Sequence, residues 1–123
     1  MARVALVTGG SRGIGAAISI GLKNAGYQVA ASYAGNEATA AEFSAETGIK
    51  TYKWDVADYD ACAAGIAQVE ADLGPVEILV NNAGITRDAP FHKMTRDQWQ
   101  QVIDTNLSGV FNMTHPIWPG MRE

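Results

Sequence analysis

The residues best placed to do chemistry lie in a turn that follows an apolar run. The turn is "TGGSRGIG" at Thr8–Gly15, in which four glycines fall within seven residues, directly behind Val4–Thr8. Clustered glycines lose much conformational entropy on folding, so they indicate a sharp turn or a close approach of the backbone to another group. A helix that begins at Gly13 would offer free N–H groups and a positive dipole end to a phosphate. The pattern predicts a dinucleotide site, and the alternative is a tight turn with incidental glycines.

Two isolated polar residues also stand at positions that a function could explain. Asp55 follows the expected third strand, Ile49–Trp54, at the carboxyl edge where open α/β sheets bind ligands. Asn106 lies on the apolar stripe of a helix, between Ile103 and Val110. Asp55 could equally be a turn residue at a helix entry, and Asn106 could be a buried amide bonded to a neighbouring carbonyl group.

The choice of cofactor depends on the end of the second apolar run. An NAD site usually has an acidic residue about 20 residues beyond the glycines, which binds the ribose 2′-hydroxyl. Ser32, Tyr33 and Ala34 supply no acid, and Glu37 comes slightly late, in the expected first turn of the next helix. Arg12 could face a 2′-phosphate and Ser32 could bond to it. We therefore expect NADP(H) rather than NAD.

Composition and charge exclude several other classes of function. The net charge is −4 and the isoelectric point is about 5.0, so neither a nucleic acid nor a membrane is expected as a partner. His92 and His115 have no ligand at metal-binding spacing, and Cys62 falls on a core stripe. A single cysteine fits a reducing cytoplasm, and the N-terminal run is too short for a signal peptide. We expect a cytoplasmic protein without a metal site.

The elements that must position these residues alternate along the chain. Strands are expected at Val4–Thr8, Tyr27–Ser32, Ile49–Trp54 and Val76–Asn81. Four helices are expected between and after them. These are a helix from Gly13 with the stripe Ile14, Ala17, Ile18, Gly21, Leu22 and Ala25; Glu37–Thr47, ended by Gly48; a helix capped by Asp58 with the stripe Tyr59, Cys62, Ile66, Val69 and Leu73; and a helix opened by the capping box Thr95–Gln98 with the stripe Trp99, Val102, Ile103, Asn106, Leu107 and Val110.

The order βαβαβαβα predicts an α/β fold. Helical crossovers of a dozen residues join parallel strands, which gives a Rossmann-type doubly wound sheet with the strand order 3-2-1-4. Residues 1–123 form one domain in this interpretation.

Three motifs in order resemble those of the short-chain dehydrogenases/reductases over the whole chain. They are Thr-Gly-x-x-x-Gly-x-Gly at Thr8–Gly15, "NNAG" at Asn81–Gly84 and "TNLSG" at Thr105–Gly109. Within the family, "NNAGITRD", "FHKMT" and "VIDTNLSGVFNMT" look most like reductases of 3-oxoacyl thioesters such as acetoacetyl-CoA. The resemblance implies NADPH-dependent reduction of an acyl-CoA or acyl-carrier-protein thioester.

The resemblance also implies a role for individual residues. Asn106 would be the catalytic asparagine, which shapes its helix and holds a water that relays protons. Asp88 would contact the substrate, whereas we interpret Arg87 as part of a solvated loop. Asp55 and Val56 would bind the adenine, and Asn82, Ala83 and Gly84 would line the ribose and nicotinamide, unless they form a plain turn. The full cofactor set is Gly9, Ser11, Arg12, Gly13, Ile14, Gly15, Ser32, Asp55, Val56, Asn82, Ala83, Gly84, Ile85 and Thr86.

The chain departs from the family pattern at its end. The family's catalytic serine and Tyr-x-x-x-Lys pair follow a fifth strand, which these residues do not contain. We expect an N-terminal half, inactive alone, and the alternative is a nucleotide-binding module without catalysis. We also expect the fourth strand to be an open edge and Met113, Ile117 and Trp118 to add exposed apolar surface. A protein of this kind is expected to form homo-oligomers.

Overall fold

The computed structural model describes residues 2–123, and its framework is a four-stranded parallel sheet. The strand order is β3-β2-β1-β4, as the sequence predicts. All five residues of β1 are buried, because this strand lies inside the sheet and is covered on both faces. The strands are β1 (Val4–Thr8), β2 (Gln28–Tyr33), β3 (Lys50–Lys53) and β4 (Val76–Val80).

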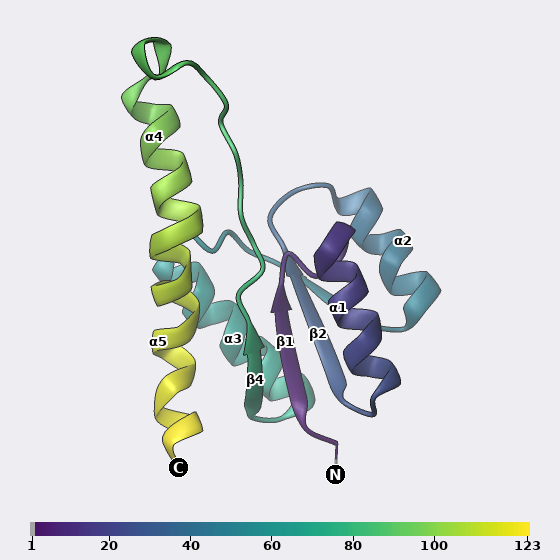
Figure 1. The fold of residues 1–123 in the computed structure, drawn as a ribbon. Coiled ribbons are helices and arrows are strands. Elements are labelled where there is room, and N and C mark those ends of the chain that lie inside the picture. The colour runs from purple at the N-terminus through teal and green to yellow at the C-terminus, as the bar shows by residue number, and fades with distance from the viewer. Residues whose placement is uncertain (1) are drawn as a thin grey trace.

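Helices cover both faces of the sheet (Figure 1). On one face, α1 (Gly13–Asn24) and α2 (Glu37–Thr47) pack over a core that includes Val7, Val29 and Phe43. On the other face, α3 (Tyr59–Leu73) and α5 (Gly109–Arg122) pack over Leu6, Val69 and Met113. The doubly wound α/β architecture predicted from the sequence is therefore confirmed.

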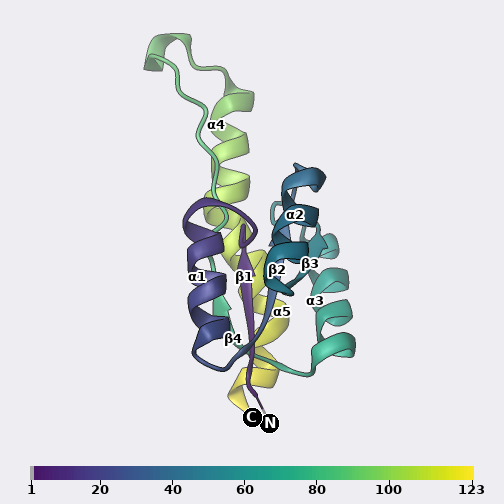
Figure 2. The same cartoon turned by 90° about the vertical axis from the view of Figure 1, so that its right-hand side faces the viewer.

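The segment between β4 and α5 projects beyond the carboxyl edge of the sheet. It contains a 3₁₀ turn (Phe91–Lys93), α4 (Arg96–Val102) and a π-helical turn (Ile103–Ser108) that runs directly into α5. Figure 1 and Figure 2 both show α4 standing away from the strands. Within residues 2–123, no helix is both long and apolar enough to cross a membrane.

Local capping residues define the helix boundaries that the sequence predicts. The Asp58 side chain accepts a hydrogen bond from the Ala61 N–H at 3.1 Å and begins α3. Gly48, with φ of 76°, ends α2 in the left-handed conformation. The predicted capping box is present, since the Thr95 hydroxyl accepts from the Gln98 N–H and the Gln98 side chain accepts from the Thr95 N–H.

The buried faces of two helices differ from the predicted stripes. In α1, Ile18 and Leu22 of the predicted stripe pack against the core, but the fully buried residues are Gly15 and Ser19, and Ile14 is 75% exposed. Trp99 in α4, Leu107 in the π-helical turn and Val110 in α5 are exposed. The buried residues of α5 are Gly109, Asn112, Met113 and Ile117. The prediction that Met113 and Ile117 add exposed surface is therefore wrong. The π-helical turn has more residues per turn than an α-helix, so the residues after it face a different side from the one that a constant 3.6-residue period predicts.

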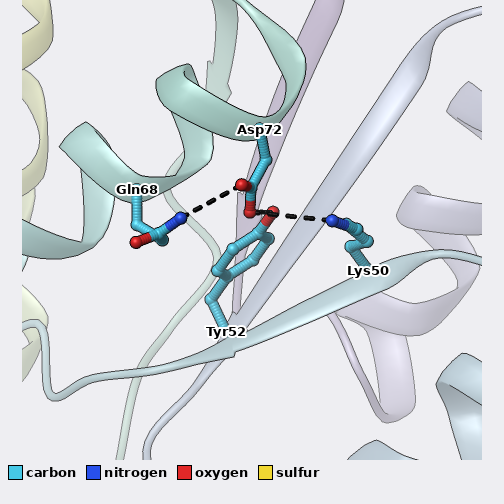
Figure 3. Close-up of polar contacts among 4 residues, drawn as sticks. All are labelled: Lys50, Tyr52, Gln68 and Asp72. Atoms are coloured by element: carbon cyan, nitrogen blue, oxygen red, sulfur yellow. Dashed lines mark hydrogen bonds and ion pairs between the residues drawn. The ribbon is translucent and has the colours of Figure 1, made fainter.

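A polar cluster fixes the edge strand β3 to α3 (Figure 3). The Tyr52 hydroxyl donates to an Asp72 carboxylate oxygen at 2.8 Å, and the Gln68 side chain donates to the other oxygen at 3.0 Å. Lys50 lies 3.7 Å from Asp72. Burial, and then the hydrogen bond and negative charge of Asp72, raise the pKa of Tyr52 to about 12.

Candidate functional site

The turn between β1 and α1 needs its glycines for two different physical reasons. Gly9 and Gly13 have φ angles of 61° and 56°, a backbone conformation that L side chains rarely adopt. Gly15 is required by proximity, because a Cβ atom there would overlap the Gly9 carbonyl oxygen and lie 2.5 Å from Asn82 Nδ2. The turn thus folds tightly onto the loop after β4 and leaves the first N–H groups of α1 uncovered by side chains.

Side chains buried beside this turn hold its carbonyl groups. Ser19, which is completely buried, donates its hydroxyl to the Gly10 carbonyl at 2.9 Å. The Asn82 amide donates to the Thr8 and Gly9 carbonyls, both at 3.2 Å. The Thr8 hydroxyl in turn accepts from the backbone N–H groups of Asn82 and Ala83. The turn after β1 and the loop after β4 therefore form one rigid unit.

The loop after β3 supplies the neighbouring wall. Asp55 is exposed, and one of its carboxylate oxygens accepts from the Ala57 N–H at 2.9 Å. Val56 is buried beneath it, between the sheet and α5. Because β3, β1 and β4 are parallel, their three following loops meet at one edge of the sheet.

These loops enclose a cavity of about 840 Å³, within the range of small-molecule sites. Every residue that the sequence motifs assign to the cofactor lines this cavity except Thr86. Thr86 lines an adjoining, more open depression together with Arg12, Arg87 and Asn106. Asp88 follows on the same loop, beyond the residues that line either hollow.

Several lining residues are not among those predicted from the sequence. Those from the end of β2 and the start of α2 are Tyr33, Ala34, Gly35, Asn36 and Thr39. Others are Trp54, Ala57, Arg87, Gln101, Asp104 and Thr105. The residues at the end of β2 and the start of α2 could have been found from the sequence, because ligands bind at the carboxyl ends of parallel strands. Gln101, Asp104 and Thr105 come from α4 and the π-helical turn, whose position depends on tertiary structure.

Asn106 lies in the π-helical turn, and its side chain is exposed rather than buried. Its Oδ1 atom accepts from the Ile85 N–H at 2.8 Å, and its Nδ2 atom donates to the Ile85 carbonyl at 2.9 Å. The Asn106 side chain thus satisfies both the N–H and the carbonyl group of Ile85. Asn106 therefore ties the helix to the loop after β4, and π-helical turns are frequent at functional sites.

The cavity-lining residues that come from the end of β2 and the start of α2 carry no charge. Arg12 is exposed and lines both hollows. Glu37, the nearest candidate for a ribose-binding acid, pairs with Lys53 at 2.5 Å and is absent from the lining. The hydrogen bond and charge of Lys53 hold the pKa of Glu37 below its usual value. Neither Glu37 nor Lys53 lines the cavity.

Cys62 belongs to the buried face of α3, as the sequence predicts. Burial raises the pKa of its thiol to about 11. The sulfur lies 3.6 Å from the Val56 carbonyl oxygen and 3.8 Å from that of Asp55. The thiol is therefore a weak hydrogen-bond donor to the loop after β3 rather than a nucleophile.

Comparisons with known proteins agree on a family. Residues 3–123 match the family model described as short chain dehydrogenase. The chain is 76% identical over its full length to an acetoacetyl-CoA reductase of Paracoccus denitrificans and 72% identical to one of Rhizobium meliloti, and it covers 51% of each. It is 45% identical, over 98% of its length, to a 3-oxoacyl-[acyl-carrier-protein] reductase of Staphylococcus aureus.

A comparison with solved structures gives the same result for the fold. A variant of a Serratia marcescens short-chain dehydrogenase/reductase superposes with a TM-score of 0.91 at 31% identity. The match covers 97% of this chain and 51% of the other. The chain spans about half the length of the curated relatives it matches.

Proposed function

Since the chain belongs to the short chain dehydrogenase family, we propose that it forms the cofactor-binding part of an NADPH-dependent reductase of 3-oxoacyl thioesters. The observation that carries the proposal is the cavity at the carboxyl edge of the sheet, which the glycine turn and the loops after β3 and β4 enclose. The relatives named acetoacetyl-CoA reductase, at 72–76% identity, support acetoacetyl-CoA as the substrate and 3-hydroxybutanoyl-CoA as the product.

The residues around the cavity fit a dinucleotide. Gly9, Gly13 and Gly15 leave the amino end of α1 open to a pyrophosphate, which the free N–H groups and the helix dipole would bind. Asp55 and Val56 would hold the adenine, and Ala83, Gly84 and Ile85 would lie along the ribose and nicotinamide. When bound, the nicotinamide supplies the hydride that reduces the keto carbon.

NADP(H) is the form of the cofactor that the charges favour. Arg12 would bind the 2′-phosphate, while Glu37, the candidate acid for a 2′-hydroxyl, pairs with Lys53 and does not line the cavity. Ser32, which the sequence also suggests for this phosphate, lines the cavity but is only 1% exposed. Arg12 therefore carries the preference, and the chain at Tyr33–Asn36 lines the same cavity.

Asn106 and Asp88 are the proposed residues on the substrate side. By its two bonds to Ile85, Asn106 would fix the loop that lies beside the nicotinamide and would hold the water of a proton relay. Asp88, further along that loop, would contact the thioester substrate. The proton donor itself would be the tyrosine that the family carries after a fifth strand.

Reduction of acetoacetyl-CoA by the full-length protein tests the function. NADPH oxidation, followed by absorbance, is expected with acetoacetyl-CoA and not with free acetoacetate. Acetoacetyl carrier protein is the second substrate to assay, because a carrier-protein reductase is 45% identical to this chain. A protein that binds NADPH but reduces neither thioester would contradict the proposed reaction.

A polypeptide limited to residues 1–123 is expected to show no turnover in the same assay. Positioned acid–base groups contribute roughly 10²–10⁴-fold to such reactions, and this polypeptide would lack the proposed tyrosine. Turnover by material whose mass is confirmed as 13.0 kDa would show that the proposed roles are wrong.

A further inference from the structure

The loop between β3 and α3 is held between two helices. A Cβ atom at Gly109 of α5 would lie 2.8 Å from Val56 Cγ2, so the absence of a side chain lets α5 approach the loop closely. At the start of the loop, the Trp54 indole N–H lies 3.3 Å from the sulfur of Met113. Helix α5 thus contacts the loop from successive turns, although it contributes no residue to the lining of the cavity.

One polar contact in this packing is specific. The Asn112 amide donates to the Val56 carbonyl at 2.9 Å, and Asn112 is only 7% exposed. The Cys62 thiol of α3 donates to the same carbonyl oxygen. A buried carbonyl that loses its main partner is destabilised, so the loop is held where both donors reach it. The fixed carbonyl lies between Asp55 and Ala57, which line the cavity.

We propose that Asn112 is a positioning residue, whose hydrogen bond to the Val56 carbonyl sets the place of the loop that binds the adenine end of the cofactor. This inference rests on the proposed function, because it assigns the adenine to Asp55 and Val56. Asn112 touches neither cofactor nor substrate, and it acts through the backbone of Val56. Its removal should therefore weaken the binding of the adenine half and leave the chemistry at the nicotinamide unchanged.

The test compares Asn112→Leu with Tyr59→Phe in the full-length protein. Leucine has the branched shape of asparagine but donates no hydrogen bond. Tyr59→Phe removes a different polar contact of α5, the one of 2.9 Å between the Tyr59 hydroxyl of α3 and His115 Nδ1, and leaves the hydrogen bond to Val56 in place. The ligand is 2′-phosphoadenosine 5′-diphosphoribose, which lacks the nicotinamide, and its affinity is measured by titration calorimetry.

We expect Asn112→Leu to weaken this ligand about three- to tenfold, the range of a single hydrogen bond, and Tyr59→Phe to leave its affinity unchanged. In steady-state assays, Asn112→Leu should raise KM for NADPH by a similar factor at constant kcat. Backbone amides at Val56–Asp58 should exchange hydrogen faster in the free variant. Asn112→Ser is the second variant, for use if Asn112→Leu does not fold. Its side chain is smaller and its hydroxyl reaches less far, so we expect smaller changes in the same measurements.

The outcomes separate the two proposals. If the unmodified protein binds neither NADPH nor 2′-phosphoadenosine 5′-diphosphoribose, the proposed function is wrong, and the proposed role of Asn112 is wrong with it. If the unmodified protein binds NADPH and 2′-phosphoadenosine 5′-diphosphoribose, and the Asn112 variants bind the latter as tightly as the unmodified protein does, only the role of Asn112 is overturned. A fall in kcat at unchanged KM would also overturn it.

Discussion

Gly15 and Gly21 lie on the same helix, but only one of them has room for a methyl group. A Cβ at Gly15 would overlap the Gly9 carbonyl oxygen, whereas at Gly21 no described atom lies within 4 Å. We therefore expect Gly15→Ala to destabilise the protein by about 1–3 kcal/mol through overpacking. Gly21→Ala should stabilise it by up to about 1 kcal/mol, because alanine favours a helix interior. Urea denaturation of the two variants measures both effects, and equal stabilities would contradict the close packing of the turn.

Arg12 is the residue on which the cofactor preference depends. Replacing it by alanine removes a charge-assisted contact to the 2′-phosphate, which is worth about 1.5–3 kcal/mol in favourable geometry. We expect Arg12→Ala to weaken NADPH binding by about tenfold or more and to leave NADH binding unchanged. Fluorescence titrations with NADPH and with NADH measure the two affinities and their ratio.

The control for Arg12 is Arg3→Ala. Arg3 forms an exposed ion pair with Glu77 at 3.1 Å, precedes β1 and lies outside the cavity lining. Its replacement removes the same charge and should change neither affinity. An unmodified protein that binds NADPH and NADH equally well would contradict the preference itself.

At the scale of elements, local signals account for what the sequence predicted correctly. Asp58, Gly48 and the Thr95–Gln98 box act within one helical turn, so their residue types suffice to define the ends of α2, α3 and α4. The π-helical turn is different, because its residues have no distinctive composition and the Asn106–Ile85 bonds that accompany it join distant segments. The face of α5 therefore could not be predicted, nor could its continuation through Pro116 and Pro119.

The link between β3 and α3 gives a prediction for alkaline pH. The tyrosine side chain has an ordinary pKa of 10.0, which applies in an unfolded chain, whereas the pKa of Tyr52 in the folded protein is about 12. Between these two values the Tyr52 hydroxyl ionises in the unfolded chain but not in the folded protein, which favours unfolding. The contribution of Tyr52 to stability is therefore complete below pH 10 and falls as the pH rises towards 12. A spectrophotometric titration of the folded protein should show a late tyrosine ionisation that Tyr52→Phe removes.

Asp72→Asn tests the cause of the shift. Burial is the largest single cause of the raised pKa of Tyr52, followed by the hydrogen bond and the charge of Asp72, so the late ionisation of Tyr52 should move part of the way back towards pH 10. A late tyrosine that is unchanged in Tyr52→Phe would show that another residue produces it.

At the scale of the whole molecule, the sequence predicts that the loops after β1, β3 and β4 lie together at the carboxyl edge of the sheet, because parallel strands with helical crossovers allow few arrangements. Gly9, Asp55 and Asn82 were therefore expected near one another, and they line one cavity. The contacts that hold these loops were not expected. Ser19 and Asn112 act on backbone carbonyls of other elements, and neither residue type nor spacing shows which carbonyl a buried side chain will reach.

The sheet and the last helices leave apolar surface open to solvent. β4 forms one edge of the sheet, and Ile78, Leu79 and Val80 are only partly buried. Five large side chains on α4, α5 and the turn between them are at least 43% exposed: Trp99, Leu107, Val110, Phe111 and Trp118. Within residues 2–123 no further strand pairs with the outer edge of β4, and these side chains are only partly covered. The open edge is a template for another strand, and the exposed side chains form an apolar patch.

A polypeptide of residues 1–123 is therefore expected to associate with itself. Burying several hundred Å² of apolar surface is worth roughly 10 kcal/mol at about 25 cal/mol per Å², comparable to the whole stability of a small domain. Sedimentation equilibrium should show species heavier than 13.0 kDa. Leu107→Glu with Phe111→Glu should reduce the association, because both side chains are more than half exposed and neither supports the core, whereas Glu42→Gln on α2 should not. A monomer with a cooperative thermal transition would show that the exposed surface is smaller in solution than these residues indicate.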